Sequence, residues 1–260
     1  MDVRAKKALG QHFLKDTGIA QRIVEALDGP CAAYGNDVLE IGPGTGVLTR
    51  FLLQRDDINL KLVEIDGESV DYLLTHFQGL QGRLLQGDFL RLPLERMFPG
   101  KFRIIGNFPY NISSQIFFKI LEHRDSIPET VCMVQKEVAG RLAEKPGTKT
   151  YGILSVLLQA WYDIEYLFTV GPESFVPPPK VHSAVIRLRR NSREALGCDE
   201  SLFKTVVKTS FGMRRKTLRN SLRSLVKDPA LLALPVFDLR PERLGVEDFI
   251  DLTNGIARQL

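Results

Sequence analysis

The feature that most constrains the fold of this chain is a glycine-rich turn directly after a short apolar run. Residues Asp37–Ile41 (DVLEI) have the character of a buried strand, and Gly42-Pro43-Gly44-Thr45-Gly46 follows at once. A helix is expected next, at Val47–Leu53. Glycines allow a sharp turn and a close approach of the backbone to a ligand. The turn therefore predicts a ligand site at the carboxyl end of a strand in an α/β sheet.

Strand and helix signals alternate along the next part of the chain. Further strands are expected at Leu60–Ile65, Arg83–Gln86, Phe102–Gly106, Glu129–Gln135, Tyr162–Val170 and Ser183–Arg189. Helices are expected at Thr17–Leu27, Glu68–Phe77, Ile112–Glu122 and Tyr151–Trp161. This alternation predicts a mostly parallel, seven-stranded sheet with helices on both faces. The short Pro-rich connection Gly171–Lys180 contains no helix signal, which favours an antiparallel final pair of strands.

The strand signals stop at about Asn191. Three helices are expected beyond it, at Phe203–Phe211, Lys216–Leu225 and Val246–Gln259. The sequence thus predicts a ligand-binding α/β domain over residues 1–190 and a small all-helical domain over residues 191–260.

Positive charge is concentrated in two clusters, although the net charge is only +4. The cluster near the start contains Arg4, Lys6 and Lys7. The second lies within residues 201–227, which hold no acidic residue, and includes Arg214, Arg215, Lys216, Arg219 and Arg223. Clustered positive charge is typical of a polyanion-binding surface, so we expect nucleic acid to bind here. A solvated helix face is the alternative for either cluster alone.

The cysteines and the apolar segments indicate the compartment. Cys31, Cys132 and Cys198 are scattered and form no CxxC pair, which predicts reduced thiols in a cytoplasmic protein and no zinc site. No metal is expected. No run approaches the roughly 20 apolar residues that a membrane span needs, and the basic first residues lack the apolar core of a secretion signal.

Acidic residues end the next two expected strands and restrict the ligand. Glu64 is placed to accept both ribose hydroxyl hydrogens of a nucleoside, and Asp88 to accept a hydrogen bond from an adenine amine. The turn reads GxGxG and lacks the third glycine of the dinucleotide pattern, and Pro43 removes an amide that a pyrophosphate could use. S-adenosylmethionine has no pyrophosphate, so it is favoured over NAD. A tight turn without a ligand, with Asp88 as a helix N-cap, is the structural alternative.

The turn Asn107-Phe108-Pro109-Tyr110 ends the fourth expected strand, beside the expected position of the reactive methyl group. The lone pair of adenine's exocyclic amine is delocalised into the ring. Two acceptors, the Asn107 side-chain oxygen and the Phe108 carbonyl, could draw the nitrogen toward a tetrahedral geometry. Pro109 restricts Phe108 to an extended conformation that presents this carbonyl. Tyr110 offers a face on which a flipped base can stack. Methyl transfer then requires positioning more than a strong general base.

With these motifs, the sequence resembles the small-subunit rRNA adenine N6,N6-dimethyltransferases, the kasugamycin-sensitivity methyltransferase family. The resemblance covers nearly the whole chain. It rests on residues 9–14 (LGQHFL), 40–46 (EIGPGTG), 63–66 (VEID), 86–88 (QGD), 106–113 (GNFPYNIS), 135–142 (QKEVAGRL), 151–152 (YG) and 175–183 (FVPPPKVHS). The chain departs from the usual family residues at two positions, with His12 where Asn is frequent and Phe108 where Leu is usual.

The resemblance implies a Rossmann-like class I methyltransferase domain followed by a helical rRNA-binding domain. The residues it implies for S-adenosylmethionine are His12, Leu14, Gly42, Gly44, Glu64, Asp88 and Asn107. The target adenine would lie between Tyr110 and Phe175. The implied substrate is a pair of adjacent adenines near the 3′ end of 16S rRNA, each methylated twice, in an immature small ribosomal subunit, and the protein is expected to be a monomer.

Three other functions are alternatives to this one. A large-subunit rRNA adenine methyltransferase of the macrolide-resistance type shares the core, but residues 175–183 and the length of the helical tail favour the small-subunit family. An NAD-dependent oxidoreductase would need GxGxxG and a residue for hydride chemistry. A non-catalytic RNA-binding assembly factor would not need Glu64, Asp88 and Asn107.

Overall fold

The computed structural model describes residues 3–29 and 34–258, so Cys31 lies outside the described residues. The chain forms two compact units. The first contains residues 1–139 and 164–190, and the second contains residues 140–163 and 191–260. The expected boundary after residue 190 coincides with one edge of this division. Residues 140–163, which the sequence assigned to the first domain, pack instead within the second unit.

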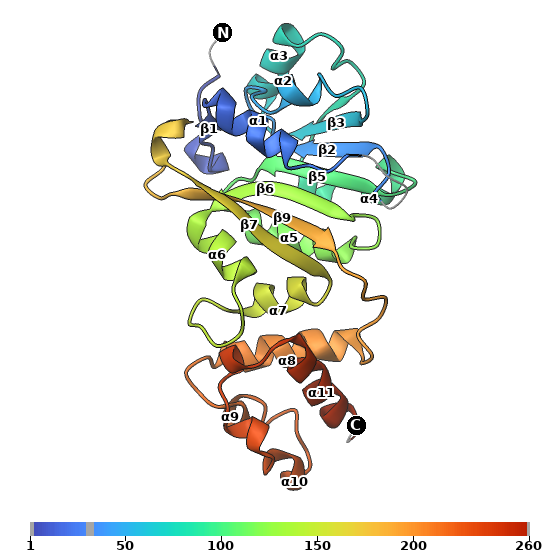
Figure 1. Ribbon diagram of the computed structural model, residues 1–260, viewed down its shortest axis with the longest axis vertical. Helices are drawn as coiled ribbons and strands as arrows, with labels where there is room; N and C mark the ends of the chain where they lie inside the picture. Colours follow the sequence, from blue (N-terminus) through green and yellow to red (C-terminus); the bar gives the residue numbers. More distant parts are fainter. Residues whose placement is uncertain (1–2, 30–33, 259–260) are drawn as a thin grey trace. The chain divides into compact units, whose positions relative to one another are not determined.

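The first unit is built on a seven-stranded sheet with the order β4-β3-β2-β5-β6-β9-β7 (Figure 1). The strands are β2 (Asp37–Ile41), β3 (Asn59–Glu64), β4 (Leu84–Gln86), β5 (Phe102–Asn107), β6 (Glu129–Gln135), β7 (Tyr162–Val170) and β9 (Ser183–Arg190). Strands β2 to β6 pair in parallel, and β9 runs antiparallel to β6. The predicted mostly parallel, seven-stranded sheet is confirmed. The strand order reverses between β2 and β5, where ligands of such sheets bind.

Helices cover both faces of this sheet, as predicted (Figure 1). On one face, α1 (Thr17–Glu25), α2 (Thr49–Leu52) and α3 (Gly67–His76) bury apolar side chains against the central strands in one continuous core. On the other face lies α5 (Ser113–Glu122), with Ile116, Phe117 and Ile120 fully buried. Shorter elements are η1 (Lys7–Leu9), η2 (Phe89–Arg91), α4 (Leu94–Met97) and η3 (Pro172–Ser174). Helix α6 (Lys136–Ala143) spans the division between the units.

Acidic caps determine where two of these helices begin. The Asp16 carboxylate accepts a hydrogen bond from the amide of Ile19 at the start of α1. The Asp66 carboxylate accepts one from the amide of Glu68 at the start of α3. Each cap satisfies an amide that has no partner within the helix. The second cap fixes α3 immediately after β3, which brings this helix to the carboxyl edge of the sheet.

A second, two-stranded sheet was not predicted from the sequence. It pairs β1 (Phe13–Leu14) with β8 (Phe175–Val176) in antiparallel fashion, with Leu14 opposite Phe175. Strands of two residues are too short to show an alternating pattern. The pairing brings residues 9–14 beside the Pro-rich loop, two segments that the resemblance joins but that lie far apart in the chain.

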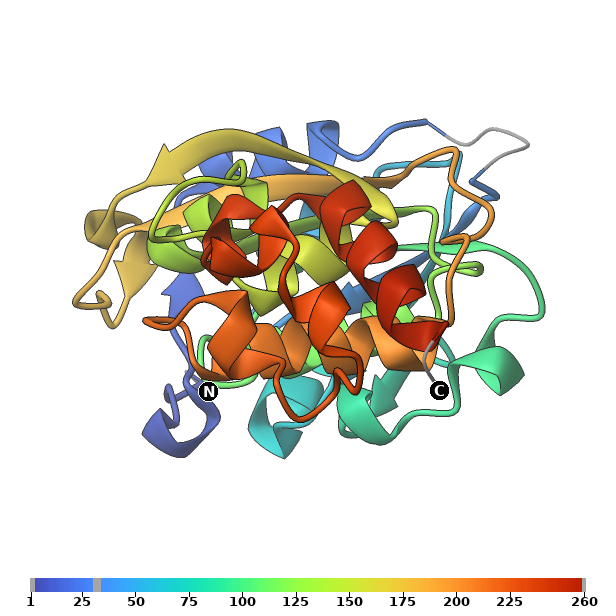
Figure 2. The same ribbon diagram turned by 90° about the horizontal axis from the view of Figure 1, so that it is seen from below.

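The second unit is helical. It contains α7 (Ile153–Gln159), α8 (Glu200–Gly212), α9 (Leu218–Ser221), α10 (Pro229–Leu232), η4 (Pro235–Asp238), η5 (Pro241–Arg243) and α11 (Val246–Ala257). Helix α8 packs against α7 and α11 (Figure 2). The ring of Phe211 in α8 lies near the rings of Tyr151 and Phe249. The helix expected at Lys216–Leu225 is reduced to α9. Over residues 3–29 and 34–258, no helix is long and apolar enough to cross a membrane.

Candidate active site

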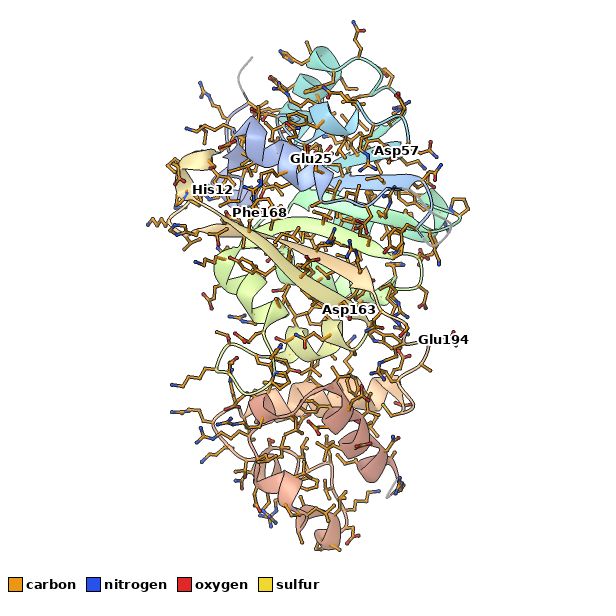
Figure 3. The ribbon with its side chains drawn as sticks, viewed as in Figure 1. His12, Glu25, Asp57, Asp163, Phe168 and Glu194 are labelled. Atoms are coloured by element: carbon orange, nitrogen blue, oxygen red, sulfur yellow. The ribbon has the colours of Figure 1, made fainter. Side chains whose placement is uncertain are left out.

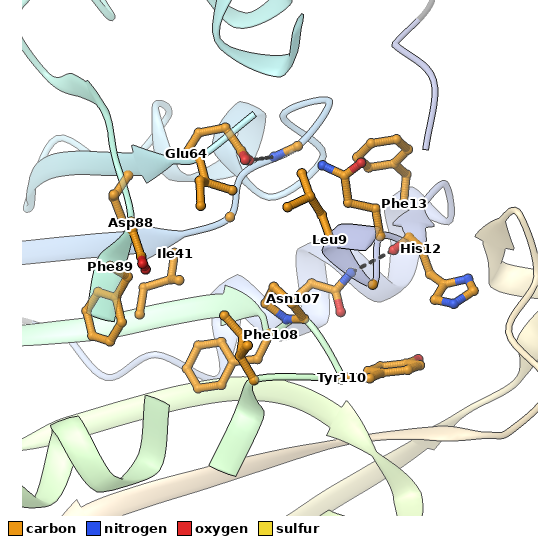
Figure 4. A pocket seen from close by; sticks show the side chains of 18 of the residues that line it. Leu9, His12, Phe13, Ile41, Glu64, Asp88, Phe89, Asn107, Phe108 and Tyr110 are labelled. Atoms are coloured by element: carbon orange, nitrogen blue, oxygen red, sulfur yellow. Dashed lines mark hydrogen bonds between the residues drawn. The ribbon is translucent and has the colours of Figure 1, made fainter. Parts of the chain in front are cut away.

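A cavity opens at the carboxyl ends of β2, β3 and β5, where the strand order reverses (Figure 4). Its walls come from residues 9–13, the glycine turn, the end of β3, the Asp88-Phe89 turn and the Asn107–Tyr110 turn. The cavity therefore brings together three motifs that the sequence predicted separately.

The Glu64 carboxylate is held by backbone amides at the centre of this wall. Its Oε2 accepts a hydrogen bond from the Gly44 amide at 3.0 Å, and its Oε1 accepts one from the Asp66 amide at 2.9 Å (Figure 4). Gly44 has a φ of +56°, and a Cβ there would lie 2.8 Å from the Phe13 ring. Burial raises the pKa of Glu64, although these amide bonds act to lower it. Each carboxylate oxygen keeps a further lone pair for a ligand hydroxyl.

Glu40 lies behind the glycine turn and is 1% exposed. Its Oε2 accepts a hydrogen bond from the Thr49 hydroxyl at 2.7 Å, and its Oε1 has no partner among the described residues. Burial raises the pKa of Glu40 to about 8. This carboxyl group is therefore protonated at neutral pH in the ligand-free protein. It borders a small cavity shared with Gly42 and Leu14.

Asp88 has two roles in the structure. Its Oδ1 accepts a hydrogen bond from the Leu90 amide at 2.9 Å and caps η2, as the structural alternative required. The residue also lines the cavity, so capping and ligand binding are compatible. The buried Lys119 of α5 supports this turn, because its ammonium donates to the carbonyls of Phe89 (2.8 Å) and Leu92 (2.7 Å). Burial lowers the pKa of Lys119.

The amide of Asn107 has a defined orientation. Its Nδ2 donates a hydrogen bond to the backbone carbonyl of His12 at 3.0 Å (Figure 4). The Oδ1 is therefore the atom left to accept hydrogen from a ligand in the cavity. The next residue, Phe108, fixes the turn with a hydrogen bond from its amide to the Met133 carbonyl at 3.0 Å. Its ring is 1% exposed and packs near Phe117, and the residue also lines the cavity.

Tyr110 lines the cavity beside Asn107, and two groups hold its ring. Its hydroxyl shares a hydrogen bond with the Ser183 hydroxyl. The imidazole of His12 lies over its ring, with centroids 5.5 Å apart and planes inclined by 28°. The Nδ1 of His12 is in turn 2.8 Å from the carbonyl of Pro177, which lies in the loop that precedes β9. Figure 3 shows His12 beside this loop. Since a carbonyl only accepts, Nδ1 carries the proton of this bond.

Phe175 and Leu14, two residues implied by the resemblance, lie in the apolar core instead. Phe175 is 1% exposed and Leu14 is 4% exposed. They face each other across the two-stranded sheet and pack among buried residues of α1 and the central strands. Leu14 borders the small cavity next to Glu40, but Phe175 lines neither cavity. The structure therefore does not bring the Phe175 ring to Tyr110.

One member of the first basic cluster forms ion pairs within the protein. The ammonium of Lys6 forms ion pairs with Asp66 and with Glu68 (3.1 Å). Gln11 donates to the other Asp66 oxygen at 3.2 Å. Burial acts to raise the pKa of Asp66, but the bonds from Lys6 and Gln11 outweigh it, and this pKa is lowered. Lys6 thus fastens the segment that covers the cavity, whereas Arg4 and Lys7 are exposed.

In the second basic cluster, too, some cations have partners within the protein and others have exposed side chains. Arg214 donates to the backbone carbonyls of Lys149 and Tyr151 and so holds the loop before α7. Arg219 pairs with Asp238 at 2.6 Å. The remaining members, Arg215, Lys216 and Arg223, have exposed side chains. The described residues contain no group of three or more side chains suited to a metal ion, and Cys132 and Cys198 are free thiols.

The fold and the site together define a Rossmann-like methyltransferase. The chain belongs to the ribosomal RNA adenine dimethylase family, whose model matches residues 3–242. It is 62% identical over 252 residues to a ribosomal RNA small subunit methyltransferase A of Parabacteroides distasonis, covering 96% of this chain and 93% of that protein. A relative of the same name from Cytophaga hutchinsonii is 57% identical over 257 residues, covering 98% of each. The family predicted from the sequence motifs is confirmed.

Solved structures agree with this membership. The crystal structure of a dimethyladenosine transferase from Plasmodium falciparum aligns with a TM-score of 0.77 at 25% identity, covering 95% of this chain and 98% of that one. The 23S rRNA methyltransferase ErmE aligns with a TM-score of 0.64 at 28% identity, covering 94% and 99%. The family and the fold exclude the NAD-dependent oxidoreductase.

Sequence reasoning missed two residues that contribute to the site, Lys119 and Ser183, and it missed the contact that His12 makes with Tyr110. Lys119 supports the Asp88 turn, Ser183 holds Tyr110, and the imidazole of His12 lies on the Tyr110 ring. A lysine within an otherwise apolar helix face was the one available signal, and it pointed to Lys119. In the sequence, Ser183 is distinguished only as the last residue of the motif at residues 175–183.

Proposed function

We propose that this protein transfers methyl groups from S-adenosylmethionine to N6 of two adjacent adenines near the 3′ end of 16S rRNA, giving N6,N6-dimethyladenosines. The observation that carries the chemistry is the orientation of Asn107, whose Nδ2 is engaged by the His12 carbonyl so that Oδ1 remains free to accept. Full-length relatives named small subunit methyltransferase support the choice of substrate.

The residues of the cavity suit S-adenosylmethionine. Glu64 would accept from the ribose hydroxyls, Asp88 from the adenine amine, and the turn at Gly42 and Gly44 would lie against the methionine portion. The Oε1 of Glu40, which has no hydrogen-bond partner among the described residues, borders the same turn. When bound, this cofactor supplies a sulfonium-activated methyl group.

The acceptor chemistry falls to the turn at the end of β5. The Asn107 Oδ1 and the Phe108 carbonyl would accept the two amine hydrogens, which frees the nitrogen lone pair for in-line attack. Preorganised acceptors of this kind need no rearrangement at the moment of reaction. The ring of Tyr110 would stack against one face of the base. After the first round the remaining N–H still finds one acceptor, so a second methylation is compatible with the site.

The exposed cations of the two clusters would contact the RNA backbone, with the helical unit as the rRNA-binding domain. We expect the protein to act as a monomer on an immature small subunit in the cytoplasm. Charge reversal at Arg215 and Lys216 should weaken RNA affinity and reduce its dependence on salt. The same change at Arg219, which is paired internally, is the matched control. If the charge reversal leaves RNA affinity unchanged at every salt concentration, Arg215 and Lys216 do not contact the RNA.

The proposed function has a direct test. The protein is incubated with labelled S-adenosylmethionine and small subunits that lack the modification, and the methylated nucleotides are mapped. Label in two adjacent adenines near the 3′ end of 16S rRNA is the expected result. Large subunits are incubated in parallel, because the structural neighbour ErmE is a 23S rRNA methyltransferase. Label that appears only in the large subunits would replace this proposal by the large-subunit one.

A further inference from the structure

We propose that Lys119 is a positioning residue of the cofactor site, whose ammonium holds the turn at Asp88 and Phe89 in the form that selects adenine over other purines. This inference rests on the proposed function, because it concerns the turn assigned there to the adenine of S-adenosylmethionine. The starting observation is a lysine in the buried, otherwise apolar face of α5.

Lys119 is an unusual residue for its position. It is 8% exposed and shares the buried face of α5 with Ile116, Phe117 and Ile120. A lysine is rarely buried unless it is paired, because its ammonium loses the hydration that stabilises the charge. The hydrogen bonds of this ammonium go to two backbone carbonyls that belong to a single turn. The buried charge is therefore compensated by that turn.

Acidic groups around the lysine favour its charged form. Burial lowers the pKa of Lys119, whereas the charges of Asp88, Glu122 and Glu95 act to raise it. A charged donor forms shorter and stronger hydrogen bonds to a carbonyl than a neutral one does. The surroundings of Lys119 thus suit an ammonium group that binds the turn firmly.

The two carbonyls lie at the two ends of η2. Phe89 is the first residue of this short helix and Leu92 directly follows its last, with distances from the Lys119 Nζ of 2.8 and 2.7 Å. A helix of one turn has few internal hydrogen bonds and is not stable by itself. Strand β4 gives it little support, because this strand has three residues and lies at the edge of the sheet. The lysine therefore fixes η2 from the side of α5.

The turn that Lys119 holds forms one wall of the cavity. Gly87, Asp88 and Phe89 line it, and Figure 4 shows Asp88 and Phe89 next to each other. The Lys119 Nζ lies 5.2 Å from the centre of the Phe89 ring, within reach of a cation–π contact. The Gly87 amide donates to the Glu64 carbonyl at 2.8 Å, which attaches the start of the turn to β3. The sheet holds the turn at one end, and Lys119 holds it at the other.

The position of the Asp88 carboxylate depends on this turn. Its Oδ1 accepts a hydrogen bond from the Leu90 amide inside η2, so a shift of η2 moves the carboxylate. Its Oδ2 lies 3.5 Å from the Nε of Arg91, whose side chain is 89% exposed. A carboxylate accepts hydrogen bonds and donates none, so it favours a purine with an amine over one with a carbonyl at the same position. Such discrimination is large only where the polar groups are aligned.

The test compares two ligands, S-adenosylhomocysteine and S-inosylhomocysteine, which carry an amine and a carbonyl on the same purine carbon. Calorimetry on the full chain measures both affinities for wild type and for Lys119→Met, which keeps most of the side-chain length and removes the donors. The affinity for S-adenosylhomocysteine should fall about five- to twentyfold, and that for S-inosylhomocysteine less than about twofold. A general loss of stability would lower both affinities alike.

Lys61→Met is the matched control. The Nζ of Lys61 also donates to a backbone carbonyl, that of Met97 at 2.8 Å, and lies 4.6 Å from the centre of the Phe98 ring. Lys61 and these two partners are not among the residues that line the cavity. This substitution should leave both affinities within about twofold of wild type.

Kinetics on undermethylated small subunits provide a second readout. Lys119→Met should raise the KM for S-adenosylmethionine by about the factor found in calorimetry. Its kcat at saturating cofactor should stay within about twofold of wild type, because the acceptor turn at the end of β5 is unchanged.

Two further variants keep the result interpretable. Lys119→Gln retains an amide donor without the charge, and it should show a smaller loss of preference for adenine if the methionine variant does not fold. Asp88→Ala removes the carboxylate through which Lys119 is inferred to act. In that background Lys119→Met should lower S-adenosylhomocysteine affinity by less than about twofold, because both substitutions remove one interaction.

The possible failures are distinct. An unchanged preference for adenine in Lys119→Met, or equal losses for both ligands, would overturn the role of Lys119 while the wild-type enzyme still methylates small subunits. A wild-type protein that binds both ligands equally would remove the assignment of Asp88 to adenine, and this inference with it. Selective binding without methyl transfer to small subunits would remove the proposed substrate and leave the role of Lys119 standing.

Discussion

The two sides of the cavity are held in place by different kinds of contact. On the cofactor side, Glu64 is fixed by the amides of Gly44 and Asp66, which are 20 and 2 residues away in the chain. On the acceptor side, His12 binds Asn107 across 95 residues and Pro177 across 165, and Tyr110 binds Ser183 across 73. The cofactor side is thus a product of adjacent strand ends, whereas the acceptor side depends on the loops that meet above them.

The largest expected effect is on the acceptor side, where one substitution should reduce methyl transfer and leave cofactor binding nearly intact. Asn107→Ala removes the one acceptor whose orientation is fixed by His12, and should lower methyl transfer at least about 100-fold, the order found when an aligned transition-state hydrogen bond is deleted. S-adenosylmethionine affinity should fall no more than a few-fold. Asn59→Ala, an exposed residue at the start of β3, is the control. Equal losses in both measurements would show that the two sides are not independent.

The next effect falls on the cofactor side. Glu64→Gln places an amide NH₂ group against one of two backbone donors and removes the charge that accepts the ribose hydroxyls. Affinity for S-adenosylmethionine, measured by calorimetry, should fall about 10- to 100-fold. At saturating cofactor, the methylation rate should recover most of its wild-type value. A rate that stays low at saturation would mean that Glu64 also positions the acceptor.

This difference explains what the sequence could predict. Glu64 and Asp88 were identified because each ends a strand, and parallel strands place their carboxyl ends along one edge. Asn107 and Tyr110 were found for the same reason. The burial of Phe175 depends on a two-residue strand pairing, which has no periodicity to detect. The hydrogen bond between Tyr110 and Ser183 joins residues that are 73 positions apart in the chain, which no local pattern reveals. Likewise, a count of positive charges could not reveal that Lys6 and Arg214 are engaged internally.

A smaller effect tests whether residues 3–14 belong to the cofactor side. Lys6→Met removes the ion pairs with Asp66 and Glu68 but keeps the length of the side chain. S-adenosylmethionine affinity should fall about three- to tenfold, because the segment that covers the cavity is less firmly held, and a partly exposed pair contributes modestly. Lys7→Met, which has an exposed side chain, is the control for charge. If both variants weaken RNA binding alike and leave cofactor affinity unchanged, Lys6 acts as an RNA contact instead.

Substitution of Glu40 should have the smallest effect on activity. Its main effect should be on how the free energy of unfolding depends on pH. The pKa of Glu40 is raised to about 8 by burial, so the folded protein binds a proton that the unfolded chain has released above its ordinary pKa of 4.5. The stability linked to this proton is fully present below pH 4.5 and is lost as the pH rises to 8. Glu64 and Glu129 have raised pKa values too and add to the same trend.

The variant Glu40→Gln measures how much Glu40 contributes to the loss of stability with rising pH. The amide resembles the protonated carboxyl group, so cofactor affinity and methylation at pH 7 should change less than about threefold. Between pH 5 and pH 8 the wild-type protein should lose stability relative to the variant, because the variant has no proton to release at this position. The difference in their free energies of unfolding should change by up to about 1.4 kcal/mol per pH unit for one proton. Urea unfolding at several pH values measures this difference. A constant difference would mean that Glu40 is ionised in the folded protein, and that the glycine turn carries a second negative charge beside Glu64.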